Sequence, residues 1–153
     1  MGAGWLVVQH LNNSGAAATA GPLVRPVAAQ GPYKVRHVTD GDTIDVLIGR
    51  RSTVIRLLGI DTPETKKPNV AVQCYGPEAS ARTTQLLSGQ SVWLETDPTQ
   101  DKLDKYGRTL AYVWLDQTLV DDVLVREGYA HEYTYGKPYA YQARFLASAC
   151  EHR

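Results

Sequence analysis

The sequence has 153 residues, of which 43% are hydrophobic, and its 16 basic residues are balanced by 16 acidic ones. This composition is typical of one domain with a hydrophobic core, and the balanced charge argues against a general cationic coat for nucleic acid without excluding a local basic site. No apolar run approaches the roughly 18 residues that a membrane-spanning helix requires, so we expect a soluble protein.

The first 32 residues differ in composition from the rest of the chain. They contain one charged side chain, Arg25, and are rich in Ala, Gly, Asn and Pro. We therefore expect a flexible leader or tether over 1–32 and one domain over 33–153. A secretory signal peptide is the weaker interpretation, because its apolar run would be short and no basic residue precedes it. Cys74 and Cys150 lack the spacing of a metal site and are expected as free thiols rather than a disulfide, which leaves the compartment open.

From residue 33 on, hydrophobic periodicity and turn residues predict regular elements. In chain order these are strands over 33–38, 43–48 and 53–60, a helix that Pro77 opens and Gly89 ends, strands over 91–95 and 110–115, a short helix over 119–127, and a last helix from about Pro138. The first three strands form a meander, because short turns containing glycine join them. The order indicates a mainly β protein of the α+β class, with a five-stranded Greek-key barrel of the OB type and about three helices.

Three polar side chains interrupt these patterns. Asp42 has even spacing to the core-facing residues of its strand, so it points toward the core. Arg56 lies inside an apolar run, where an unpaired guanidinium is costly and a partner or an anionic ligand is expected. Arg108 follows a polar loop directly into a strand. Each residue has an ordinary explanation by itself: Asp42 as a turn residue, Arg56 as part of an ion pair, and Arg108 as the solvated flank of a turn. Three such interruptions in one small domain nevertheless favour a functional site.

A pair of acidic residues flanks a Thr-Pro dipeptide in the stretch GIDTPETKKP, residues 59–68. This stretch is either an ordinary surface turn or a device that presents oxygen atoms to a cation. Asp61 together with Asp42 and backbone carbonyls gives an oxygen-only set, which suits Ca²⁺ or Mg²⁺ better than zinc or copper. Arginine pairs suit phosphate, and Glu64 is free to orient or deprotonate a water. Cation, carboxylate and arginines are the parts that phosphodiester hydrolysis needs.

Four motifs occur in a fixed order along the chain: DGDT at 40–43, RLLGIDTPET at 56–65, YGPEAS at 75–80 and DKYGR at 104–108. With these motifs the chain closely resembles the staphylococcal nuclease (thermonuclease) family from about residue 33 to the C-terminus. The resemblance implies an OB-type barrel with three helices. It also implies a Ca²⁺-dependent, sugar-nonspecific endonuclease that hydrolyses phosphodiester bonds of DNA and RNA and leaves 3′-phosphate ends.

The resemblance also implies a role for individual residues. It assigns the calcium ligands to Asp42, Asp61 and the backbone carbonyl of Thr62. It assigns the catalytic groups to Arg56, Arg108 and Glu64, the last as general base. The residues that it assigns to nucleotide binding are Lys105, Tyr106, Tyr133 and Tyr135, whereas Tyr139 and Tyr141 are expected to pack in the core.

Other consequences of the resemblance concern the whole protein. Some family members are secreted and others are inactive domains, so export is favoured, and a catalytically inactive OB-type module that binds nucleic acid or protein is the alternative function. The chain keeps every carboxylate and arginine of the motifs, which favours the enzyme, and we expect a monomer. The balanced charge differs from the strongly basic staphylococcal enzyme and predicts weaker, less salt-sensitive binding of nucleic acid.

Overall fold

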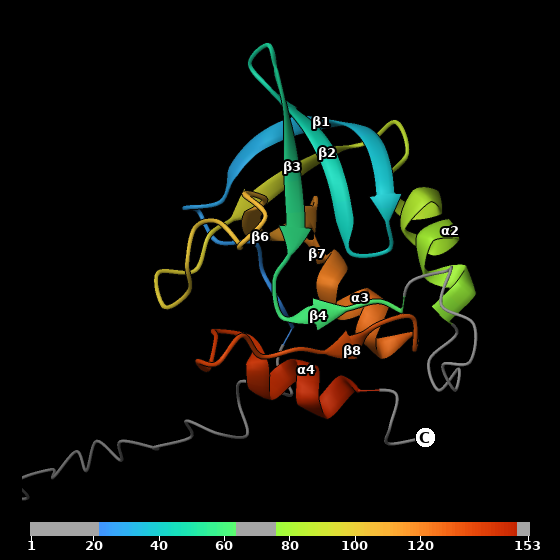
Figure 1. Cartoon of the computed structure of the whole chain (residues 1–153), viewed down its shortest axis with the longest axis vertical. Coiled ribbons are helices and arrows are strands. Elements are labelled where there is room, and N and C mark those ends of the chain that lie inside the picture. Colours follow the sequence, from blue (N-terminus) through green and yellow to red (C-terminus); the bar gives the residue numbers. More distant parts are fainter. Residues whose placement is uncertain (1–21, 64–75, 150–153) are drawn as a thin grey trace, which may run out of the picture.

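A closed barrel of five strands forms the centre of the structure (Figure 1). The computed structural model describes residues 22–63 and 76–149, so Cys74 and Cys150 lie outside the described residues. The barrel strands are β1 (Gln30–Asp40), β2 (Thr43–Ile48), β3 (Arg51–Leu57), β5 (Ser91–Glu95) and β6 (Thr109–Leu115). Their order is β3-β2-β1-β5-β6, and the parallel pairing of β3 with β6 closes the barrel. The predicted five-stranded barrel of the OB type is confirmed.

Strand β1 is long enough to pair with two neighbours. Its first part pairs with β5, where Tyr33 lies opposite Val92, and its second part pairs with β2, where Val38 lies opposite Ile44. Register shifts follow Val35 and Val38. Such bulges bend a strand and increase its twist, which lets β1 curve around the barrel.

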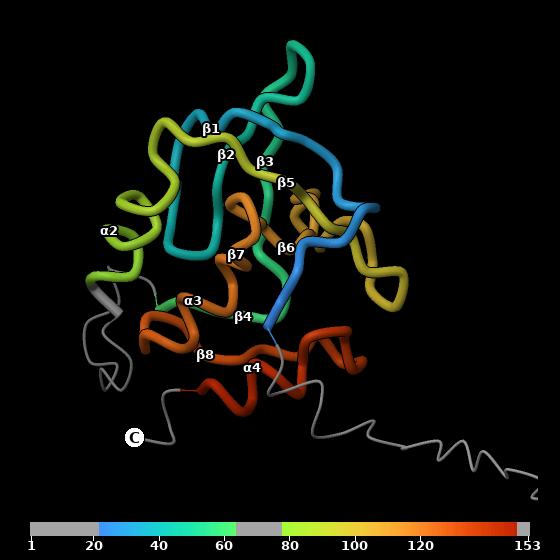
Figure 2. Tube along the Cα trace, turned by 180° about the vertical axis from the view of Figure 1, so that it is seen from behind, coloured from blue at the N-terminus to red at the C-terminus, as the bar shows by residue number. Residues whose placement is uncertain are grey.

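Three helices accompany the barrel among the described residues, as predicted. They are α2 (Gly76–Leu87), α3 (Val120–Arg126) and α4 (Gln142–Ser148). Helix α2 flanks the barrel, and α3 lies between the barrel and α4 in both views (Figures 1 and 2). Three two-residue strands complete the fold: β7 (Thr118–Leu119) pairs with β6, and β4 (Ile60–Asp61) pairs with β8 (His131–Glu132). None of the helices described is long and apolar enough to cross a membrane.

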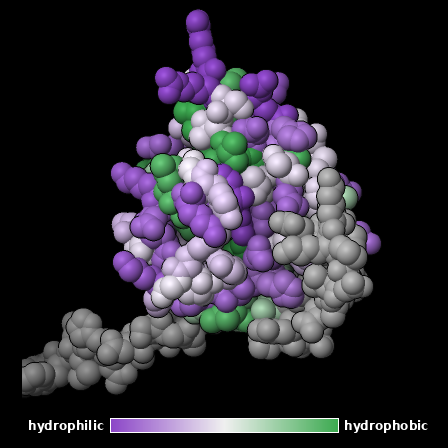
Figure 3. Space-filling view, viewed as in Figure 1, coloured by the Kyte–Doolittle hydropathy of each residue, from purple (hydrophilic) through white to green (hydrophobic). Residues whose placement is uncertain are grey.

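The core is formed by buried side chains of the barrel strands and of α3. Fully buried side chains include Ile44, Val46, Ile55, Leu57, Trp114 and Leu124. Burying one such side chain contributes about 1.5–3 kcal/mol, so this set supplies the main stabilisation. On the face shown in Figure 3, hydrophilic side chains surround separate hydrophobic ones, which is ordinary for a folded surface.

Tyr139 and Tyr141 belong to the core beside α4. The Tyr139 hydroxyl donates to the carbonyl oxygen of Gly59 at 3.0 Å, and its ring centroid lies 5.8 Å from that of Phe145. The ring of Tyr141 meets Tyr112 edge-on at 4.6 Å. The packing role predicted for both tyrosines is confirmed.

The strand predicted over 53–60 is divided into β3 and β4, because the chain turns at Gly59. This glycine has φ of +80°, and a Cβ there would lie 2.5 Å from the ring of Tyr139 and 2.7 Å from that of Phe145. Glycine is therefore required by both the backbone conformation and the close approach. The turn directs the next residues, including Asp61, away from the barrel and toward β8.

The last helix begins at Gln142, later than the predicted start near Pro138. The backbone N–H of Ala140 donates to Oδ2 of Asp97 at 2.9 Å. This bond fixes the residues before the helix against the turn that follows β5. Tertiary contact, rather than helical hydrogen bonding, thus determines the backbone there.

Residues before Tyr33 contact the barrel as well. The guanidinium carbon of Arg25 lies 4.0 Å from the ring centroid of Trp93, and Nη1 of Arg25 donates to the carbonyl of Asp116 at 2.8 Å. The division of the chain into a leader over 1–32 and a domain over 33–153 stays a prediction.

Candidate active site

The turn between β1 and β2 places Asp42 at the end of the barrel. The carbonyl oxygen of Gly41 accepts a bond from the Thr83 hydroxyl of α2 at 2.7 Å, which fixes the turn against that helix. A Cβ at Gly41 would lie 2.9 Å from side-chain atoms of both Thr62 and Ala79, so the turn and the β4 end approach each other closely. The predicted inward direction of Asp42 is confirmed, since its side chain is 7% exposed.

The carboxylate of Asp42 has a donor on each oxygen. Its Oδ1 accepts from the Thr43 hydroxyl at 2.8 Å, and its Oδ2 accepts from the backbone N–H of Thr62 at 3.0 Å. Nη2 of Arg56 lies 3.2 Å from the same Oδ2. Oδ2 of Asp42 therefore contacts both Arg56 of β3 and Thr62, the residue after β4.

Arg56 projects from the end of β3 into the same place. Its Nη1 donates to the carbonyls of Leu57 and Ile60, both at 2.8 Å. Its Nη2 lies 3.1 Å from Oδ1 of Asp61 as well as near Asp42. The partner expected for a buried arginine is thus a pair of carboxylates, and the backbone carbonyls hold the guanidinium in one orientation.

Asp61 is the exposed member of this group, with 52% of its side chain accessible. Partial burial raises the pKa of Asp61, Arg56 opposes this, and the nearby Asp42 carboxylate raises the pKa further. The hydroxyl oxygen of Thr62 is buried and has no hydrogen-bond partner within residues 22–63 and 76–149. Two adjacent carboxylates that share one guanidinium nitrogen leave anionic oxygen atoms for a further cation. An all-oxygen set of this kind suits a hard cation.

No group of three or more His, Cys, Asp or Glu side chains capable of holding a metal occurs within residues 22–63 and 76–149. The predicted ligand set contains two such side chains and one backbone carbonyl, so it does not form a group of that kind. Glu64, the predicted general base, lies outside the described residues. Its role stays a prediction.

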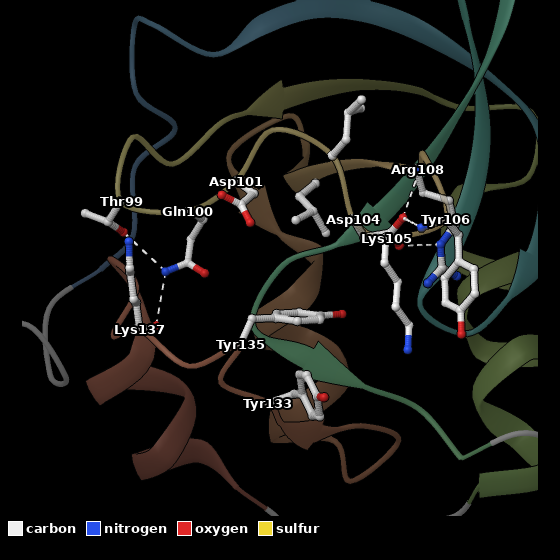
Figure 4. Close-up of a pocket in the computed structure, with 12 residues that line it drawn as sticks. Thr99, Gln100, Asp101, Asp104, Lys105, Tyr106, Arg108, Tyr133, Tyr135 and Lys137 are labelled. Atoms are coloured by element: carbon white, nitrogen blue, oxygen red, sulfur yellow. Dashed lines mark hydrogen bonds and ion pairs between the residues drawn. The ribbon is translucent and has the colours of Figure 1, made fainter.

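The loop between β5 and β6 delivers Arg108 next to a pocket of about 340 Å³. The pocket is lined by Thr99, Gln100, Asp101, Leu103, Asp104, Lys105, Tyr106, Arg108, Leu110, Tyr133, Tyr135 and Lys137 (Figure 4). All four residues predicted to bind a nucleotide are in this set, together with one predicted catalytic arginine. The structure thus brings together residues that are remote in the sequence.

Two tyrosines form one wall of the pocket. The rings of Tyr133 and Tyr135 meet edge-on with centroids 4.5 Å apart, and Tyr133 is 42% exposed. Burial raises the pKa of Tyr135, with Arg56 opposing, and the charges of Asp42 and Arg108 also act on it. Arg56 of the acidic cluster pairs across β3 and β6 with Leu110, which lines the pocket, so the cluster and the pocket are neighbours.

Sequence reasoning assigned no role to Asp104, Gln100, Asp101 or Lys137, although all four line the pocket. Asp104 stands inside the quoted motif DKYGR, but an aspartate in a polar loop is ordinary. Only the structure reveals that its carboxylate contacts Arg108.

Comparison with known proteins gives consistent matches. A family described as "Staphylococcal nuclease homologue" matches residues 54–152. A thermonuclease of Staphylococcus hyicus is 45% identical over 139 residues, which cover 91% of this chain and 79% of that protein. A thermonuclease of Staphylococcus intermedius is 43% identical over 125 residues, which cover 82% of this chain and 71% of that protein. Endonuclease YncB of Bacillus subtilis (strain 168) is 48% identical over 91 residues, 60% of this chain and 43% of that protein.

Proposed function

The chain belongs to the staphylococcal nuclease family and is a nuclease, and from this premise we propose that it hydrolyses DNA and RNA in a Ca²⁺-dependent reaction that leaves 3′-phosphate ends. One observation carries this proposal. Arg56 is held between the carboxylates of Asp42 and Asp61 at 3.2 and 3.1 Å, and it pairs across the strands with Leu110, which lines the pocket that contains Arg108. Oxygen ligands for a cation and guanidinium groups for a phosphate therefore occur in one site.

We assign the cation to Asp42, Asp61 and the backbone carbonyl of Thr62. The residues present fit Ca²⁺, because they offer oxygen atoms alone and because two adjacent carboxylates lack full compensation by Arg56. When bound, a divalent cation there would neutralise phosphate charge and lower the pKa of a coordinated water.

Arg56 and Arg108 are the groups that stabilise the phosphate in our proposal. Nη1 of Arg56 is fixed on two backbone carbonyls, and its Nη2 lies beside the carboxylates that we assign to the cation, so the guanidinium would stand next to a phosphate bound to that cation. Arg108 bonds to Asp104 through Nε, which leaves both of its Nη groups for phosphate oxygens. Charge accumulates on the phosphoryl oxygens in the transition state, and fixed guanidinium groups stabilise that state more than the ground state.

Glu64 would orient or deprotonate the attacking water. This assignment follows the family motif, in which Glu64 comes two residues after Thr62. A proton would then move from the water to the Glu64 carboxylate as the new P–O bond forms. The bond from phosphorus to the 5′ oxygen would break, and this oxygen would take a proton from solvent, which leaves a 3′-phosphate and a 5′-hydroxyl.

The pocket would hold the nucleotide next to the scissile bond. Tyr133 and Tyr135 offer ring faces and edges for a base, a contact that tolerates any base. Tyr106 is 70% exposed, and Nζ of Lys105 lies 5.0 Å from its ring centroid. We assign both residues to contacts with the sugar-phosphate. Contacts of this kind do not select the sugar, which supports action on both DNA and RNA.

Digestion of labelled DNA and RNA tests this function directly. Purified protein is incubated with Ca²⁺, with Mg²⁺, or with a chelator, and the products are treated with a 3′-phosphatase before electrophoresis. We expect cleavage of both polymers in Ca²⁺ and a mobility shift after phosphatase treatment. Binding of the polymers without cleavage in any cation would instead support the inactive OB-type module.

Three further proposals concern the whole protein. They are export from the cell, which the family resemblance favours, action as a monomer, and a tether role for residues 1–32, which their composition favours. Sedimentation of the purified chain measures the second of these, and a dimer at micromolar concentration would overturn it.

A further inference from the structure

Asp104 places a carboxylate in the pocket that we propose for a phosphate. Its side chain is 6% exposed, and the pocket also contains Lys105 and Arg108. A negative charge in this position repels a polyanionic substrate, so electrostatics alone would disfavour aspartate. The hydrogen bonds of the carboxylate indicate what it contributes.

The two oxygen atoms of Asp104 have separate functions. Oδ1 accepts from the backbone N–H groups of Tyr106 and Arg108, each at 2.9 Å, which closes the turn before β6. Oδ2 accepts from Nε of Arg108 at 2.6 Å, and this bond is drawn in Figure 4. One oxygen therefore shapes the backbone and the other contacts the guanidinium.

The bond to Nε determines how Arg108 presents itself. A guanidinium is a rigid plane, so fixing Nε fixes the orientation of that plane and with it the directions of the two Nη groups. Tyr106 limits rotation further, since the guanidinium carbon of Arg108 lies 5.2 Å from its ring centroid. The Arg108 side chain is 30% exposed, and at that exposure an arginine without such a partner samples several rotamers.

The ionised state of Asp104 is consistent with this geometry. Burial of its carboxyl group opposes ionisation, but the backbone and side-chain bonds from Arg108 and the backbone bond from Tyr106 outweigh it and lower the pKa.

We propose that Asp104 is a positioning residue, which holds Nε of Arg108 so that both Nη groups face the phosphate of the substrate. The inference rests on the proposed nuclease function. It explains why a pocket for an anion contains a carboxylate. The benefit of a correctly oriented Arg108 guanidinium outweighs the repulsion between Asp104 and the phosphate.

The variant Asp104→Asn separates the two functions of this side chain. Asparagine keeps an oxygen for the backbone N–H groups of Tyr106 and Arg108, but its amide nitrogen cannot accept from Nε. We expect the melting temperature to change little and kcat on single-stranded DNA to fall by about 10- to 100-fold, as misplacement of a catalytic group does. KM should stay the same or fall, because a negative charge leaves the pocket.

Asp116→Asn is the control for the change of charge. The Asp116 side chain is 90% exposed and does not line the pocket, so its substitution removes the same charge away from the site. We expect kcat to be within about twofold of wild type in this variant, because kcat depends on groups that act in the transition state. A fall in kcat of equal size in both variants, or an unchanged kcat in Asp104→Asn, would overturn the proposal.

A double-mutant cycle with Arg108→Ala tests whether the effect of Asp104 on kcat depends on Arg108. Since Asp104 acts through Arg108, Asp104→Asn should cause no further loss of kcat when Arg108 is absent. Additive losses would contradict the positioning role.

A spectroscopic readout separates this proposal from the proposed function. In ¹⁵N NMR spectra the Nε–H of Arg108 should be protected from solvent exchange in the wild type and should lose protection in Asp104→Asn. If the wild-type protein cleaves nothing, the nuclease proposal fails while the protection still reports the contact. If the wild type cleaves but Nε–H exchanges at the same rate in both proteins, the positioning proposal fails alone.

Discussion

Arg56 and Asp42 form an ion pair of 3.2 Å in which the two side chains are 6% and 7% exposed. Arg56 comes from the end of β3 and Asp42 from the turn between β1 and β2, and Asp61 approaches the same guanidinium nitrogen from β4. The pair connects the barrel to the segment that carries the acidic motif. Its burial makes it a structural element as well as a part of the site.

Removal of the arginine should therefore destabilise the protein. Arg56→Met leaves Asp42 buried without its cation and next to the like charge of Asp61. We expect the free energy of unfolding to fall by about 3–5 kcal/mol, the usual cost of breaking a buried pair. Urea denaturation of the purified variant measures it.

Arg82→Met is the control for that substitution. Arg82 pairs with Glu127 at 2.8 Å, but the two side chains are 25% and 35% exposed. Ion pairs that solvent screens contribute about 0–1 kcal/mol to the free energy of unfolding, so the urea midpoint of this variant should lie near that of the wild type. Equal losses in the two arginine variants would contradict the importance of burial.

Glu64→Gln and Arg108→Ala should nearly abolish cleavage without unfolding the protein. Each removes a group that acts on the transition state, and the loss of one such group lowers kcat by about 10²- to 10³-fold. Single-turnover cleavage of an end-labelled oligonucleotide measures the rate, and circular dichroism measures the fold. Full activity of Glu64→Gln would exclude the base role.

Asp97 should make the fold sensitive to acid. Its carboxylate accepts bonds from the Tyr112 hydroxyl at 2.6 Å, from the backbone N–H of Ala140 at 2.9 Å, and from both Thr99 donors. Burial opposes ionisation, but these bonds outweigh it and lower the pKa of Asp97 below its ordinary 3.8. A lowered pKa gives stability that is present above pH 3.8 and is lost as the pH falls through the folded-state value.

Asp97→Asn tests this contribution. Its melting temperature should lie below that of the wild type at pH 7, by an amount equivalent to about 1–3 kcal/mol, and the difference should shrink as the pH falls below about 4. A difference that is constant from pH 7 to pH 2 would show that the charge of Asp97 has no part in the effect.

Asp121 should have the opposite effect on stability. The residue is completely buried, its Oδ1 accepts from the backbone N–H of Val113 at 2.9 Å, and its Oδ2 has no partner among the described residues. Burial raises its pKa well above 3.8, with Val113 opposing. The folded state thus favours the protonated acid, and stability is lost as the pH rises from 3.8 toward the folded-state value.

Asp121→Asn should therefore raise the melting temperature at pH 8 and have a smaller effect at pH 3. Asparagine keeps the oxygen that Val113 requires and removes the ionisation. Thermal melts of both proteins at the two pH values measure the difference. A larger gain in melting temperature at pH 3 than at pH 8 would contradict a raised pKa of Asp121.

Gly59→Ala should destabilise the protein more than substitution of another left-handed glycine. The new Cβ would overlap the rings of Tyr139 and Phe145, and φ is +80°. Gly49 has φ of +62°, and apart from its chain neighbours no atom of the described residues lies within 4 Å of its Cβ position, so Gly49→Ala carries the backbone cost of about 1–2 kcal/mol alone. We expect a lower urea midpoint for Gly59→Ala, and equal midpoints would contradict the role of the ring contacts.

The barrel could be predicted from the sequence because its strands carry strong local signals. The strands over 43–48 and 91–95 are found with the predicted bounds. The division of β3 from β4 could not be predicted, since it depends on the rings of two residues from the far end of the chain that approach Gly59. The start of α4 was missed for the same kind of reason, a contact with Asp97.

Parts of the site were visible for a different reason. Asp42 and Arg56 interrupt apolar patterns, so the sequence alone indicated two polar side chains that point toward the core. Asp104 stands among polar loop residues, where no pattern is broken. Its contact with Arg108 depends on the tight turn at Gly107, which only the folded chain shows.

The most direct test of the proposed function compares cleavage by the wild type with cleavage by a variant that combines Asp42→Asn and Asp61→Asn. Both proteins are assayed on the same DNA across a titration of Ca²⁺, after thermal melts show that each is folded. We predict that wild-type cleavage rises with Ca²⁺ and stops in chelator, while the variant is inactive at every concentration. Equal cleavage by the two proteins, or wild-type cleavage that persists in chelator, would contradict the proposed site.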